Sequence, residues 1–63
     1  MRFNKQNVKD ALIARIARLE DQWNFDPNNG YDQVKNSDFH RVMAYGEYDA
    51  LGNFLDVIEY NLL

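Results

Sequence analysis

The clearest pattern of apolar and polar positions lies between Asn7 and Trp23. This segment contains neither Gly nor Pro and is rich in Ala, Leu, Arg and Glu, which favour a helix. Apolar side chains recur every three or four residues, at Val8, Leu12, Ile16, Leu19 and Trp23. On a helix, this spacing places them along one stripe. The sequence therefore predicts an amphipathic helix that buries this stripe.

Two residues are candidates for the N-cap of this helix. If Asn4 is the cap, Phe3 and Val8 occupy the two positions of a hydrophobic staple. If Asn7 is the cap, Asp10 lies in the first turn, near the positive end of the helix. We prefer Asn4, because Phe3 then has an apolar partner. The predicted helix covers about residues 4–23.

A polar loop is predicted at residues 24–36. Pro27 disfavours helical backbone at the residue before it, and Asn29-Gly30 is a strong turn signal. We expect Phe25, an apolar residue within this polar stretch, to fold back on the core. Residues 31–35 alternate too weakly to predict a strand, and a single strand would have no partner.

Two further helices are predicted, at about residues 38–45 and 47–62. Ser37 is a good N-cap for the first of them, with Asp38 beside it at the favourable end. Their apolar stripes are Phe39, Val42, Met43 and Gly46, and then Leu51, Phe54, Leu55, Ile58 and Leu62. At 100° per residue the two stripes point roughly 120° apart. A straight helix would therefore bury two different sides.

We predict a break or bend near Gly46, because glycine suits a helix end or a kink. The alternative is one long helix, packed by the first helix on one side and by a second subunit on the other. In both cases the expected fold is all-α, a small bundle of two to three helices. Residues 1–63 are expected to form a single domain.

The size and composition of the chain limit how it can be stabilised. It has 63 residues and no Cys, which excludes disulfides and thiolate metal sites. Domains below ~70–80 residues often rely on a disulfide, a metal or self-association. We therefore expect stability to come from helix packing or oligomerisation. No apolar run approaches the ~20 residues of a membrane span or forms a signal peptide, so we expect a cytoplasmic protein without membrane contact.

The net charge of −3 is divided unevenly along the chain. Residues 1–37 carry +1, whereas residues 38–63 carry −4 and contain Arg41 as their one Lys or Arg. Binding to phosphates requires Lys and Arg, so direct nucleic-acid contact is not expected. An acidic half of this kind favours a basic surface on a partner.

Few residues are candidates for catalysis. His40 is the only His, and Ser37 is the only Ser and is expected to cap a helix. With no Cys or Thr, a nucleophile–base–acid set cannot be assembled. Asp56 and Glu59 would be neighbours on a helix, but a catalytic acid pair also needs a pocket, a large hole for so small a chain. We expect a protein that is not an enzyme and has no cofactor or metal.

A calcium-binding loop is an alternative interpretation of residues 26–32, which carry oxygen donors at alternate positions. The EF-hand register does not fit them. With Gly30 at position 6 of that motif, Phe25 falls at position 1; with Asp26 at position 1, Ser37 falls at position 12, where Glu is required. Turns stabilised by Asn and Asp side chains explain the composition of this loop without a metal.

The functional prediction depends on an acidic, Tyr-bearing face of the second and third helices. We expect this face to project away from the core and to dock on the basic surface of a larger protein, as a regulator or inhibitor. The face consists of Tyr45, Tyr48, Asp49, Asp56, Glu59 and Tyr60.

Two alternatives to this docking face remain. The same face could imitate nucleic acid and inhibit a DNA- or RNA-binding protein. In the other alternative the chain is the subunit of a structural homo-oligomer, of which a homodimer is the simplest form. Leu62, Leu63 and the second apolar stripe would then pack against another copy.

Overall fold

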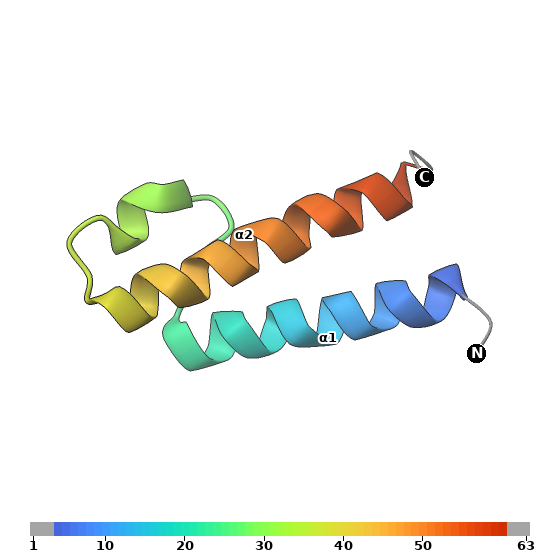
Figure 1. Cartoon of the computed structure of the whole chain (residues 1–63), viewed down its shortest axis with the longest axis horizontal. Coiled ribbons are helices and arrows are strands. Elements are labelled where there is room, and N and C mark those ends of the chain that lie inside the picture. Colours follow the sequence, from blue (N-terminus) through green and yellow to red (C-terminus); the bar gives the residue numbers. More distant parts are fainter. Residues whose placement is uncertain (1–3, 61–63) are drawn as a thin grey trace.

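The computed structural model describes residues 4–60, which form an antiparallel helical hairpin (Figure 1). Helix α1 spans Lys5–Trp23, the short 3-10 helix η1 spans Gly30–Val34, and helix α2 spans Phe39–Glu59. The two long helices lie side by side, and η1 packs on α2. There is no strand within the described residues, and the predicted small all-α bundle is confirmed.

Asn4 caps the start of α1, as predicted. Its side-chain oxygen accepts hydrogen bonds from the backbone N–H groups of Gln6 and Asn7, at 2.9 and 3.3 Å. These donors lie in the first turn of the helix and have no partner inside it. The helix ends at Asn24, whose backbone is left-handed (φ 58°), a conformation that Asn tolerates better than most residues. Phe3, the other half of the predicted staple, lies outside the described residues.

Arg41 connects the loop to both long helices. Its guanidinium donates hydrogen bonds to the carbonyl of Trp23 at 3.0 Å, to the carbonyl of Gln33 at 2.7 Å and to the hydroxyl of Ser37 at 3.1 Å. It also lies over the ring of Phe25, 5.2 Å from the ring centroid. Phe25 is buried, so the prediction that it folds back on the core is confirmed.

The N-cap predicted for the second helix was wrong by one residue. Asp38, not Ser37, caps α2, because its carboxylate accepts the backbone N–H of Arg41 at 3.0 Å. The Ser37 hydroxyl instead accepts from the side chain of Arg41. Ser37 and Asp38 are adjacent and both suit a cap, so sequence alone does not separate them. In the structure Asp38 accepts the backbone N–H of Arg41, whereas Ser37 accepts its guanidinium.

The predicted break near Gly46 is also wrong, since α2 continues through this residue. A helical glycine costs only about 1 kcal/mol relative to alanine, which packing along the whole helix can outweigh. One inward stripe runs the length of α2, because Tyr48 fills the interval between the two predicted stripes. This stripe consists of buried or half-buried side chains, namely Val42, Ala44, Tyr45, Tyr48, Leu51, Leu55 and Ile58.

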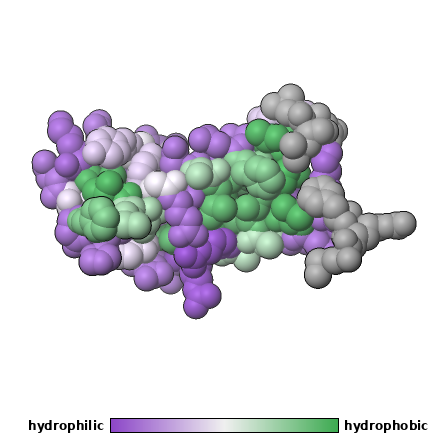
Figure 2. All heavy atoms as spheres, viewed as in Figure 1, coloured by the Kyte–Doolittle hydropathy of each residue, from purple (hydrophilic) through white to green (hydrophobic). Residues whose placement is uncertain are grey.

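The core lies at the loop end of the hairpin. Four buried side chains form it: Leu19 from α1, Phe25 from the loop, Val34 from η1 and Tyr48 from α2. Ile58 is buried separately, near the C-terminal end of α2. Apolar surface also reaches the outside, in two patches separated by a band of polar side chains on the face shown in Figure 2. The hairpin therefore does not bury all of its apolar surface.

Candidate functional site

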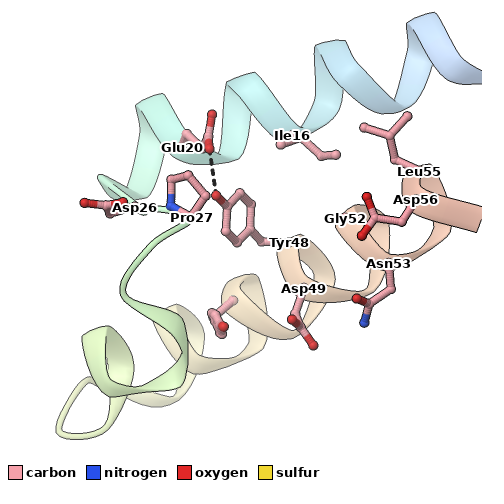
Figure 3. Close-up of a pocket in the computed structure, with 11 residues that line it drawn as sticks. Ile16, Glu20, Asp26, Pro27, Tyr48, Asp49, Gly52, Asn53, Leu55 and Asp56 are labelled. Carbon is pink, nitrogen blue, oxygen red and sulfur yellow. Dashed lines mark hydrogen bonds between the residues drawn. The ribbon is translucent and has the colours of Figure 1, made fainter. Parts of the chain in front are cut away.

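A pocket of about 330 Å³ opens between α1 and α2, beside the loop that joins them (Figure 3). This volume is at the lower end of the ~300–1,000 Å³ range of ligand pockets. The apolar and aromatic part of its lining comes from both helices and the loop, and consists of Ile16, Pro27, Tyr45, Tyr48 and Leu55.

Four carboxylates also line the pocket. Glu20 comes from α1, Asp26 from the loop, and Asp49 and Asp56 from α2. Asp49 and Asp56 are seven positions apart, close to two helical turns, so both lie on one side of α2, about 10 Å apart along its axis. No Lys, Arg or His is among the described residues that line the pocket. The pocket therefore combines an apolar lining with negative charge.

Glu20 and Tyr48 are joined across the pocket. The Tyr48 hydroxyl donates a hydrogen bond of 2.6 Å to Glu20 Oε2 (Figure 3). Burial raises the pKa of Tyr48 well above its usual value of 10.0, and the hydrogen bond to Glu20 raises it further. The Tyr48 hydroxyl therefore keeps its proton, and with it the hydrogen bond to Glu20, to a higher pH than an exposed tyrosine would. Its ring is held in place in the wall of the pocket.

The carboxylate of Asp26 takes part in the structure of the loop. It accepts the backbone N–H of Asn28 at 2.8 Å. The side chain of Gln33 accepts the backbone N–H of Asp26 at 2.8 Å and donates to its carbonyl at 3.0 Å. These contacts position Asp26 and Pro27 at the loop end of the pocket (Figure 3).

Asp49 and Asp56 differ from the other two acids. Both are exposed, and within residues 4–60 neither has an ion pair or a side-chain hydrogen bond. Their charge is therefore not neutralised by the described part of the hairpin. These two side chains are the ones best placed to meet a ligand.

Gly52 lies on α2 between these two acids and also lines the pocket. Its backbone is helical, and a Cβ atom added there would have no other atom within 4 Å. The fold itself therefore does not require glycine at this position. A side chain at residue 52 would enter space that the pocket now leaves open.

The structure brings together four of the six residues of the predicted docking face. Tyr45, Tyr48, Asp49 and Asp56 all line the pocket. The predicted exposure of Tyr48 is wrong, because only 8% of its surface is accessible. Tyr45 is half-buried as well, with its ring against those of Phe25 and Tyr48. A tyrosine can be buried when its hydroxyl has a partner, and for Tyr48 that partner is Glu20.

The other two predicted residues lie outside the pocket. Glu59 is directed toward α1, where its carboxylate is 3.6 Å from the Nζ atom of Lys9. Tyr60 is 72% exposed and does not line the pocket. The predicted docking face did not include Glu20 or Asp26, although Glu20 is four residues after Ile16 and so neighbours it on the edge of the buried stripe.

Other candidate sites lack comparable geometry. His40 is exposed, and its ring contacts that of Phe39, with 6.0 Å between centroids. In the part of the chain that the structure describes, no three His, Asp or Glu side chains converge closely enough to hold a metal ion.

Over residues 4–60, neither long helix is apolar enough to cross a membrane.

Comparisons with protein-family models, curated proteins and solved structures find no match for this chain. Its function therefore has to be inferred from the chemistry of the pocket and of the remaining surface.

Proposed function

We propose that the protein is a non-enzymatic protein-binding module whose acidic pocket receives an arginine side chain of a larger partner. The observation that carries this proposal is the combination of four carboxylates with an apolar and aromatic lining and no lining Lys, Arg or His among the described residues. An arginine has the matching combination of an apolar stem and a planar cation that pairs with carboxylates and stacks on aromatic rings.

The positions of the side chains suit this ligand. Asp49 and Asp56 are available to pair with the guanidinium, because no described group neutralises them. The half-buried ring of Tyr45 offers stacking surface, and the stem can pack on Ile16. Asp49 and Asp56 are exposed in the free protein, so their hydrogen bonds to the guanidinium would exceed the strength of ordinary surface pairs only once the partner covers the pocket and excludes water.

A basic surface that is covered in this way cannot bind another ligand at the same time. We therefore propose a role as a regulator or inhibitor, which acts by occupying the partner. Because the pocket takes a single side chain, most of the affinity and specificity would come from the surrounding contacts.

The direct test is an NMR titration of the labelled protein with a short peptide that contains one arginine. The matched control is the same peptide with citrulline, which keeps the shape of arginine but has no charge. We expect the arginine peptide to shift the amide signals of Asp49, Gly52 and Asp56, and the citrulline peptide to leave them unchanged. Equal shifts with both peptides would contradict a pocket that recognises charge.

Two protein variants with the same net charge locate the binding site. The first is Asp49→Asn with Asp56→Asn, in the pocket. The second is Asp10→Asn with Asp21→Asn, two exposed acids on α1 that do not line the pocket. We expect only the first variant to lose the response to arginine and the capture of a partner from a lysate. If both variants lose capture equally, the binding depends on overall charge and the proposal is wrong.

A further inference from the structure

Helix α2 carries a second apolar stripe that the fold leaves uncovered. We call it the outer stripe. Phe39 is 72% exposed, Met43 is 58% exposed and Phe54 is 40% exposed. The residues recur every three or four positions and share one side of α2, away from the inward stripe. The outer stripe consists of five exposed residues, Phe39, Met43, Gly46, Ala50 and Phe54, and of Val57, which is half-buried.

Gly46 at the centre of the outer stripe has no explanation within one copy of the chain. Its backbone is helical, and an added Cβ atom would meet no other atom within 4 Å. A glycine inside a helix lowers its stability relative to alanine, and no contact within the protomer requires glycine at this position. Close approach of another backbone at Gly46 would supply the reason.

The hairpin also has a small core. Within residues 4–60 only five apolar side chains are buried, and the chain has no Cys from which a disulfide could form. Chains of this length often gain stability by self-association. Because α2 is continuous, its exposed apolar residues lie on a second side of one straight helix, where a second subunit can pack.

The order of side-chain sizes along the outer stripe reads nearly the same from both ends. Phe39 and Met43 are large, Gly46 and Ala50 at the centre are small, and Phe54 and Val57 are large again. We propose that the outer stripe is the interface of an antiparallel homodimer with its two-fold axis near residue 48. Gly46 of one protomer lies against Ala50 of its partner, Met43 against Phe54, and Phe39 against Val57.

A second copy fits this stripe better than an unrelated surface, because a two-fold interface must be complementary to itself. In this arrangement the small residues Gly46 and Ala50 meet at the centre of the interface, and the larger residues pack on either side of them. The stripe contains no charged side chain. On the flank, Glu47 accepts two hydrogen bonds from the guanidinium of Arg15, at 2.7 and 3.0 Å, so its charge is compensated within the protomer. The outer stripe shares no residue with the pocket, and the dimer is therefore independent of the proposed function.

The dimensions indicate a weak dimer. From Phe39 to Val57 the stripe is about 27 Å long, the rise of 18 residues. The stripe has six residues per protomer, whereas a typical stable interface involves roughly 20–30 residues on each side. We expect the dimer to form at high protein concentration and to dissociate on dilution.

Sedimentation equilibrium over about 1 µM to 1 mM protein tests this interface. We expect the average mass to rise from that of one chain toward that of two. Ala50→Glu should keep the mass at one chain over the whole range, while the matched variant Ala14→Glu, at an exposed position of α1, should behave as the native protein. Circular dichroism checks that both variants keep their helices. A constant monomer mass for the native chain, or equal association of the Ala50→Glu variant, would overturn the proposal.

Cysteine variants test the orientation, because the native chain has no Cys to interfere. Phe39→Cys and Val57→Cys proteins are mixed and treated with a short bis-maleimide crosslinker. We expect crosslinks between the two variants and none within either one, since the two copies of residue 39 would be about 27 Å apart. Crosslinking of Phe39→Cys to itself would indicate a parallel dimer and would refute the antiparallel arrangement.

Discussion

The hydroxyl of Tyr48 donates a 2.6 Å hydrogen bond to the carboxylate of Glu20, and this bond joins the middle of α2 to the last turns of α1. The contact allows a polar side chain to occupy the core beside Leu19 and Phe25. It also fixes two walls of the acidic pocket at once, because both residues line it. Stability and the shape of the pocket therefore depend on the same pair.

Replacing Tyr48 separates the contribution of its hydroxyl from that of its ring. Tyr48→Phe keeps the buried ring and should lower the free energy of unfolding by about 1 kcal/mol, the usual net value of one hydrogen bond. Tyr48→Ala should cost about 3–5 kcal/mol, because it also leaves a cavity. Urea denaturation followed by circular dichroism measures both. An equal loss in the two variants would show that ring packing at this position contributes nothing.

The raised pKa of Tyr48 predicts a loss of stability in alkali. The unfolded chain gives up the Tyr48 proton near pH 10, whereas the folded chain holds it to higher pH. The stabilising contribution is therefore fully present below about pH 10 and is lost as the pH rises above that value. Urea midpoints between about pH 8 and 11.5 should fall more steeply for the native protein than for Tyr48→Phe. Parallel pH profiles would contradict this prediction.

Arg41 should be the most important polar residue for the position of the loop. Arg41→Met keeps much of the stem but removes the hydrogen bonds to the carbonyls of Trp23 and Gln33. Because both carbonyls would lose this donor, we expect a loss of about 2–3 kcal/mol in unfolding free energy. Arg41→Lys should restore only part of it, since an ammonium group cannot reproduce the planar fork. Full recovery with Lys would show that charge alone is sufficient.

Gly52→Ala should affect stability and binding in opposite directions. The added methyl group has no atom to clash with, and alanine favours a helix by up to about 1 kcal/mol, so the free energy of unfolding should rise. The same group occupies pocket space between Asp49 and Asp56, so the NMR response to the arginine peptide should weaken. A variant that is more stable but binds the peptide unchanged would place the ligand elsewhere.

Much of the fold could be predicted because the determining interactions are local. The period of Val8, Leu12, Ile16 and Leu19 defines α1, and Asn4 caps it through donors two and three residues away. The break at Gly46 was predicted wrongly because Tyr48 was assigned to solvent. Tyrosine has both an apolar ring and a polar hydroxyl, so its side of a helix depends on whether a partner such as Glu20 is within reach.

Sequence alone was enough to predict the helical class, the first helix with its cap, the loop that folds Phe25 inward and the concentration of acidic charge in the second half. Each of these depends on residues a few positions apart or on composition. The packed hairpin was needed to show that Tyr48 is buried, that α2 is continuous and that Glu20 and Asp26 join Asp49 and Asp56 around one pocket. Asp49 and Asp56 are 23 to 36 positions from Asp26 and Glu20 in the chain, and the packing of α2 against α1 and the loop is what brings them together.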